Sequence, residues 1–199
     1  MINTVRLRCM LGWLGLLLPW IVVLLLWMFP ASISATYYTY ESGPVFMIIL
    51  GSSSFLLISY KGYDRFDDLL NTFAGCFGLM ICLFPCCNEE LTYVGTFQLP
   101  VNISSIIHNA SAVGFFACLS FNSLFRFTKH GNQPITENKK KRNIIYTICG
   151  IGMIASFSMF LLPDFHIKVW LIEAVALFFF GISFLTKADH YKWLFCDPK

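Results

Sequence analysis

Residues 11–29 read LGWLGLLLPWIVVLLLWMF, an unbroken apolar run that decides the class of this protein. A helix needs roughly 17 to 25 such residues to cross about 30 Å of hydrocarbon. The apolar region of a secretory signal is shorter, at roughly 7 to 15 residues. We therefore expect this run to form a membrane-spanning helix that the protein retains.

Five more apolar segments follow along the chain. Together with the first, the predicted spans are residues 11–29, 45–60, 69–85, 103–125, 143–162 and 167–185. With 57% hydrophobic and 13% charged residues, the 199-residue chain has almost no material left for a soluble domain. The sequence therefore predicts an all-α fold, a polytopic membrane bundle of six transmembrane helices that forms a single domain over residues 1–199.

Positive charge alternates between the segments that connect these spans. Of the 14 Lys and Arg residues, all but Lys168 lie in the two tails or in the second and fourth loops. Short loops that are rich in Lys and Arg stay in the cytoplasm. We therefore predict that both termini are cytoplasmic and that the odd-numbered loops are outside. The run from Lys139 to Arg142 suits an anchor against anionic lipid, so the bilayer is the expected partner and nucleic acid is not.

Histidine and cysteine do not follow a metal-binding pattern. None of the spacings among the eight cysteines matches a zinc site, and His108 is the only histidine inside a predicted span. We therefore expect neither a metal nor a cofactor.

Polar residues predicted near the outer side form the first candidate site. Glu173 lies about a turn and a half inside the sixth span, where a carboxyl group is costly and normally faces the interior of the bundle. His108 lies at a similar depth in the fourth span, so the two side chains are candidates for contact. The candidate outer pocket comprises His108, Glu173, Ser32, Ser34, Tyr37, Cys86 and Ser111. A protonated Glu173 in one interhelical hydrogen bond, with tyrosines serving as headgroup-level belt residues, is the structural alternative.

The predicted inner side carries a second cluster, Asp64, Asp67 and Asp68, next to the basic residues Lys61 and Arg65. Carboxylates at the start of a helix bind free backbone amides and interact favourably with the helix dipole. Capping of the third span by Asp67 and Asp68 is therefore the simpler interpretation. A cytoplasmic switch or ion site is the alternative.

Several stretches resemble a known family. They are residues 32–39 (SISATYYT), 60–64 (YKGYD) and 84–85 (FP), with His108 ahead of a helix of small residues and Glu173 ahead of residues 180–183 (FGIS). These features are similar to small six-span bacterial membrane proteins grouped as a domain of unknown function, the DUF998-like set. The resemblance covers most of the chain and implies a six-span topology in the bacterial cytoplasmic (inner) membrane. It implies no activity.

Three functional hypotheses follow from these observations. The leading one is a non-enzymatic, multi-pass membrane protein that binds or senses a lipid or small amphiphile through an outward-facing polar pocket. The first alternative is an intramembrane enzyme that modifies lipid, since the pocket residues offer an acid, a base and hydroxyl groups. The second is a proton-coupled carrier, although the chain lacks the internal repeats found in many transporters. The oligomeric state stays open.

Overall fold

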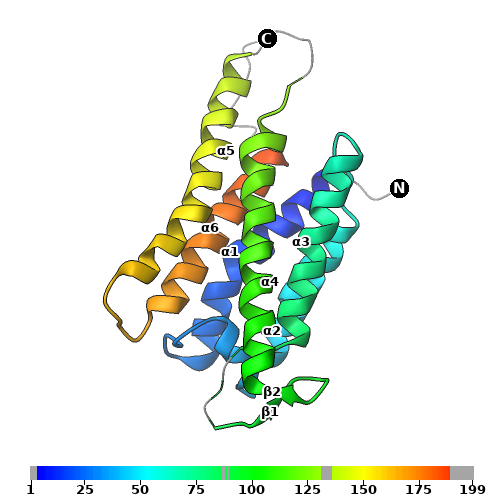
Figure 1. Cartoon of the computed structure of the whole chain (residues 1–199). Helices are drawn as coiled ribbons and strands as arrows, with labels where there is room; N and C mark the ends of the chain where they lie inside the picture. The colour runs from blue at the N-terminus through cyan, green and yellow to red at the C-terminus, as the bar shows by residue number, and fades with distance from the viewer. Residues whose placement is uncertain (1–3, 87, 89, 131–135, 189–199) are drawn as a thin grey trace.

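The computed structural model describes residues 4–86, 88, 90–130 and 136–188, and these residues form an elongated helical bundle (Figure 1). The helices are α1 (Thr4–Leu26), α2 (Gly43–Ile58), α3 (Arg65–Leu83), α4 (Val101–Phe121), α5 (Glu137–Ser156) and α6 (Lys168–Lys187). The shorter elements are the 3₁₀ turns η1 (Ser34–Tyr38) and η3 (Phe157–Leu161), the π-helical η2 (Asn122–Phe127), and the antiparallel pair β1 (Tyr93–Val94) and β2 (Leu99–Pro100).

Five of these helices are long and apolar enough to cross a membrane, counting η2 with α4 and η3 with α5. The sixth, α2, is apolar but has only 16 residues, which gives a length of about 24 Å. The structure thus confirms an all-helical protein with several apolar helices of membrane-spanning length.

The helices do not begin and end where the predicted spans do. Helix α1 begins at Thr4 and ends before Trp27, whose φ of 54° is incompatible with a continuing helix. Helix α5 begins at Glu137, so the basic run from Lys139 to Arg142 lies inside its first turns and does not precede it. The hydroxyl of Thr136 accepts a hydrogen bond from the Lys139 N–H and caps this polar start. Hydropathy locates the apolar part of a helix, whereas the polar turns that extend it depend on capping.

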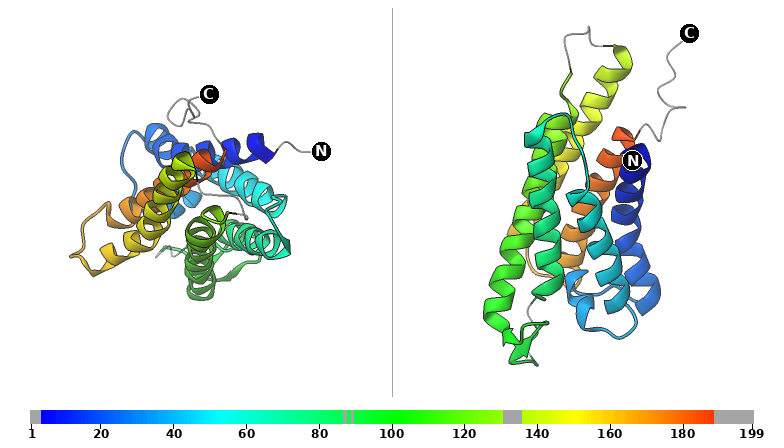
Figure 2. Two further views of the ribbon diagram at one scale, coloured as in Figure 1. Left: turned by 90° about the horizontal axis from the view of Figure 1, so that it is seen from above. Right: turned by 90° about the vertical axis from the view of Figure 1, so that its right-hand side faces the viewer.

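The six helices form a ring. Each helix packs against its neighbours in the sequence, and α6 returns to pack against α1 (Figure 2). Helices α1 and α6 approach closely because glycines meet at the crossing. A Cβ atom on Gly12 would lie 2.9 Å from the Gly181 carbonyl oxygen, and one on Gly181 would lie 2.7 Å from the Gly12 oxygen. Small residues allow this approach where the lipid supplies no hydrophobic driving force.

A second close contact joins α2 and α3. The sequence places Asn71, Gly75, Gly78 and Cys82 on one face of α3, and the structure buries all four. A Cβ atom on Gly75 would lie 2.5 Å from the carbonyl oxygen of Ser54 in α2. This face of α3 therefore packs closely against α2 through its small residues.

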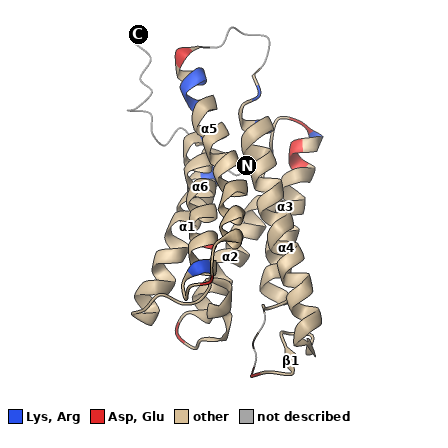
Figure 3. Ribbon diagram, turned by 60° about the vertical axis from the view of Figure 1, so that its left-hand side comes forward, with Lys and Arg blue, Asp and Glu red and all other residues tan. Residues whose placement is uncertain are grey.

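The two ends of the ring differ in charge. Lys and Arg gather at the end where α3 and α5 begin, which we call the basic end (Figure 3). The opposite end carries η1 and the β1–β2 pair and is called the hairpin end. Helix α1 begins and α6 ends at the basic end, where Arg8 donates to the carbonyl of Lys187.

Candidate functional site

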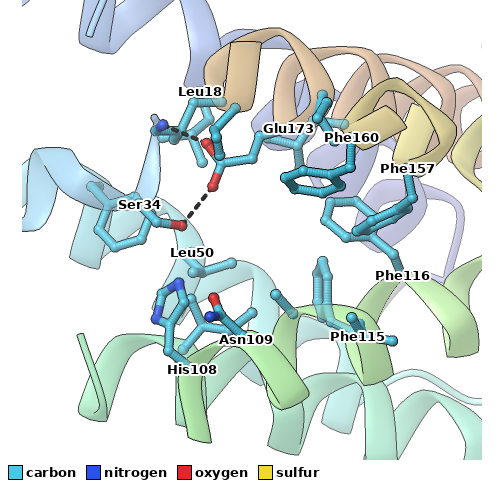
Figure 4. A pocket seen from close by; sticks show the side chains of 18 residues that line it. Leu18, Ser34, Leu50, His108, Asn109, Phe115, Phe116, Phe157, Phe160 and Glu173 are labelled. Carbon is cyan, nitrogen blue, oxygen red and sulfur yellow. Dashed lines mark hydrogen bonds between the residues drawn. The ribbon is translucent and has the colours of Figure 1, made fainter. Parts of the chain in front are cut away.

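A cavity of about 490 Å³ lies inside the ring near the hairpin end (Figure 4). Its walls come mainly from α2, α4, α6 and η3, with the segment that leads into η1 closing one side. Three of the residues predicted for the outer pocket line this cavity, namely Ser34, His108 and Glu173. Residues from three distant parts of the sequence therefore share one space.

Glu173 is held by two hydrogen-bond donors, one from the segment between α1 and η1 and one from the first residue of η1. The backbone N–H of Ile33 donates to one carboxyl oxygen at 2.5 Å, and the Ser34 hydroxyl donates to the other at 2.8 Å. The same segment is joined to α6 a second time, because the Trp170 N–H donates to the carbonyl of Ala31 at 3.0 Å. Both carboxyl oxygens are thus oriented, and the side chain stays only partly buried because it borders the cavity.

His108 is buried, with 3% of its surface exposed, and lies across the cavity from Glu173 (Figure 4). Its Nδ1 atom is 2.8 Å from the carbonyl oxygen of Phe84. Because a carbonyl only accepts, Nδ1 carries the proton in this contact. The hydrogen bonds described for His108 and Glu173 lead to other groups, so the two share a cavity without a direct bond.

The other end of the cavity is aromatic. Phe115 and Phe116 of α4 face Phe157 and Phe160 of η3 (Figure 4). The rings of Phe116 and Phe157 pack edge to face, with 5.7 Å between their centroids. Ligand pockets commonly combine an apolar lining with a few polar groups that set orientation. This cavity has that composition. Its polar side chains lie at one end, and the phenylalanine rings of α4 and η3 lie at the other.

The aromatic end reaches the flank of the bundle. Val113 of α4 and Phe160 of η3 both line the cavity, yet 58% and 51% of their surfaces are exposed. Val169, near the start of α6, is a third exposed lining residue. In a membrane this flank faces acyl chains, so the cavity opens sideways between α4 and η3.

The other four residues predicted for the outer pocket do not line the cavity. The Ser32 hydroxyl accepts from the Ala35 N–H and forms a local turn, and the Ser111 hydroxyl donates to the carbonyl of Ile107 within α4. Tyr37 packs edge to face on Tyr38, whose hydroxyl donates to the carbonyl of Cys86. These side chains support the cavity wall and the hairpin end.

Sequence reasoning missed the aromatic wall, the Ile33 N–H and Asn109, which also lines the cavity. Phenylalanine occurs throughout the predicted spans, so no pattern distinguishes cavity-lining rings from core rings. The backbone N–H of Ile33 becomes a partner for Glu173 only through the loop conformation. Asn109 directly follows His108, and that adjacency was the one available signal.

The predicted inner cluster lies at the basic end and is joined by ion pairs to η2. Asp64 caps α3 by accepting from the N–H groups of Phe66 and Asp67. Its carboxylate also pairs with Arg126 at 2.6 Å and with Lys129 at 2.9 Å. Arg126 makes a further pair with the buried carboxylate of Asp67. These contacts tie the α2–α3 loop to the end of α4.

The prediction that Asp67 and Asp68 cap α3 was wrong in detail, because Asp64 is the N-cap. Asp67 and Asp68 turn back and accept from the N–H groups of Tyr63 and Gly62, each at 2.8 Å. Hydrogen bonds from Lys129, the Asp67 N–H and Arg126 hold the pKa of the Asp64 carboxyl well below its usual value. Every carboxylate of the cluster therefore has a structural partner.

A further set of contacts closes the basic end. Arg8 of α1 donates to the Tyr60 hydroxyl at 3.0 Å, and burial raises the pKa of this phenol, which keeps it neutral. Lys187 at the end of α6 donates to the Tyr63 hydroxyl at 2.7 Å. The α2–α3 loop therefore contacts α1, η2 and α6, whereas the cavity occupies the hairpin end.

Among the described residues, no three His, Cys, Asp or Glu side chains come together as ligands for a metal ion. In comparisons with known proteins, no family model, no curated protein and no solved structure matches this chain.

Proposed function

We propose that this protein is a multi-pass membrane protein that binds a lipid or small amphiphile in the cavity at its hairpin end. The observation that carries the proposal is the division of the cavity. Ser34, His108 and Glu173 lie at one end, and phenylalanines lie at the other, next to an opening on the flank. An amphiphile that enters from the bilayer places its chain among the rings and its headgroup beside the polar side chains.

The proposed topology has six crossings with both termini in the cytoplasm. The basic end is then the cytoplasmic end, in keeping with the retention of Lys and Arg on that side. Helix α2 is short but lies in the ring between α1 and α3, and a locally thinner bilayer or flanking polar residues accommodate such a helix. The cavity then opens in the outer half of the membrane. Membership of the DUF998-like set and a location in the bacterial cytoplasmic membrane are parts of the same proposal.

The contacts favour binding over hydrolysis. In the serine triad the base that takes the proton of the nucleophile is a histidine hydrogen-bonded to the serine. Here the hydroxyl of Ser34 donates to Glu173, and the Nδ1 atom of His108 is bonded to the Phe84 carbonyl. We therefore propose that these groups hold a headgroup in place.

A cavity-filling substitution tests the proposal. Ala112 lines the cavity, whereas Ala110 lies on the exposed side of the same helix, so Ala112→Trp and Ala110→Trp form a matched pair. The probe is a 12-carbon alcohol with a diazirine in its chain, photolysed with the purified protein in nanodiscs. We expect saturable crosslinks to peptides that contain Phe116 and Phe157 in the parent and in Ala110→Trp, and their loss in Ala112→Trp. Crosslinking that does not saturate, or that survives in Ala112→Trp, contradicts the proposal.

A further inference from the structure

The polar end of the cavity carries the Glu173 carboxyl group and no Lys or Arg among its described lining residues. Both carboxyl oxygens of Glu173 accept hydrogen bonds, and the His108 ring borders the same end of the cavity. A ligand headgroup that binds the Glu173 carboxyl group therefore has to supply the hydrogen-bond donors itself.

The nearest basic residue along α6 is Lys168, and its ammonium group is already engaged. It donates to the carbonyl oxygens of Phe160 and Leu162 at 3.1 and 2.6 Å and to the carboxylate of Asp164 at 2.9 Å. An ammonium has three N–H donors, so these contacts use all of them. Lys168 thus closes the end of η3, and it has no donor left for an anionic headgroup in the cavity.

We propose that the cavity selects single-chain amphiphiles whose headgroup donates hydrogen bonds and carries no negative charge. Long-chain primary amines bind best. This inference rests on the proposed function. A protonated amine brings three donors to a space bordered by the Glu173 carboxyl group and the His108 ring. Hydrogen bonds between charged partners are roughly twice as strong as neutral ones. A fatty alcohol brings one donor and binds less tightly.

Anionic amphiphiles are disfavoured by the same geometry. A carboxylate or phosphate headgroup would lie beside Glu173 with no cation to offset the repulsion, at a site where the low dielectric strengthens it. The cavity therefore discriminates by the sign of charge as well as by shape.

Competition against the photoreactive alcohol measures this selectivity. Dodecylamine, dodecanol and dodecanoate have equal chains and are added to the nanodiscs, with partitioning into protein-free nanodiscs measured for correction. We expect dodecylamine to displace the probe at a bilayer concentration about tenfold below that of dodecanoate, with dodecanol between them. Equal competition by dodecanoate overturns the selectivity and leaves amphiphile binding intact. Absence of saturable probe crosslinking overturns amphiphile binding itself, and the selectivity with it.

Two variants that each remove one carboxylate test whether Glu173 causes the selectivity. Glu173→Gln keeps the side-chain size and removes the charge, so the advantage of dodecylamine over dodecanol should disappear while dodecanol still competes. Glu41→Gln removes a carboxylate in the exposed segment before α2 that does not line the cavity, so it should leave the order unchanged. If Glu173→Gln does not fold, Ser34→Ala replaces it. That change removes a donor that orients the carboxyl group, and it should reduce the amine advantage in part. An unchanged order in the folded variant contradicts the assignment to Glu173.

Discussion

Glu173 shows how a carboxyl group is accommodated in an apolar helix. The sequence makes it the costliest residue of the sixth span, and the structure supplies it with the Ile33 N–H and the Ser34 hydroxyl. His108 follows the same rule, since its Nδ1 atom is bonded to the Phe84 carbonyl. In both cases the partner comes from a loop or helix end that has polar groups to spare. The free sides of both groups border the cavity.

At this scale, Ser34→Ala should lower the stability of the protein. The substitution removes one of the two donors to the Glu173 carboxyl group, and an intramolecular hydrogen bond contributes about 0.5 to 1.5 kcal/mol net. Ser32→Ala is the matched control, because the Ser32 hydroxyl accepts only from the Ala35 N–H among the described contacts. Unfolding in detergent, followed by circular dichroism, should show a larger loss for Ser34→Ala. Equal losses would mean that the bond to Glu173 adds little.

Two different kinds of contact join the elements of the ring. Glycines bring α1 and α6, and also α2 and α3, into close backbone contact. The α2–α3 loop is joined to η2 by the ion pairs of Asp64 and Asp67. Glycine contacts depend on shape alone, whereas ion pairs depend on protonation. The glycine contacts should therefore be sensitive to added side-chain volume, and the ion pairs should be sensitive to pH.

Gly12→Ala should destabilise the α1–α6 contact. The added Cβ atom would lie 2.6 Å from Cγ of Leu185 and 2.9 Å from the Gly181 oxygen, so α1 and α6 would have to separate. Overpacking of this kind costs about 1 to 3 kcal/mol. In Gly51→Ala the new Cβ atom meets no heavy atom within 4 Å, so this helical glycine provides the control. Thermal unfolding of the two variants should move in opposite directions, because alanine favours a helix where space permits. A neutral Gly12→Ala would contradict the close crossing.

Acid should weaken the joint between α3 and η2. The pKa of Asp64 is lower in the folded protein than its usual value of 3.8, so the unfolded chain binds the proton more readily. The stabilisation by this group is therefore complete above its usual pKa and is lost as the pH falls below about 3.8. Asp64→Asn should have a lower melting temperature at neutral pH and a smaller further decrease in acid.

The control for the pH series is Glu41→Gln, a charge removal in the exposed segment before α2. It should retain the full acid dependence of the parent. Melting temperatures measured between about pH 3 and pH 7 compare the three proteins. If the melting temperatures of the parent and of Asp64→Asn decrease equally in acid, the Asp64 ion pairs have no role in the acid dependence.

At the scale of the whole molecule, the two ends of the ring differ in how closely they are packed. The basic end is closed by contacts among α1, the α2–α3 loop, η2 and α6. The hairpin end keeps a cavity because η3 continues α5 beside α4 and the two present phenylalanines to each other across a space. A ring that is tight at one end and open at the other suits a binding site accessible from one half of the bilayer.

Cysteine labelling tests the proposed topology across the shortest helix. Tyr40, which is 93% exposed, precedes α2, and the exposed Lys61 follows it. With a membrane-impermeant maleimide on intact cells, Tyr40→Cys should gain labelling over the parent, whereas Lys61→Cys should gain it only after permeabilisation. Gains for both residues from outside would mean that α2 does not cross. A gain for Lys61→Cys alone would invert the topology.

Local patterns in the sequence determined the helical class, the approximate position of each apolar segment, the separation of charge between the ends and the packing face of α3. These properties follow from hydropathy and from the 3.6-residue period, which each segment carries on its own. The helix starts were less predictable, since Asp64 and Thr136 act through hydrogen bonds to particular N–H groups. Only the tertiary structure decided that Ser34 bonds to Glu173 while Ser32 forms a turn, and that phenylalanines of α4 and η3 enclose a cavity. Such choices depend on how distant helices and loops are placed against one another, and neighbouring residues do not encode that placement.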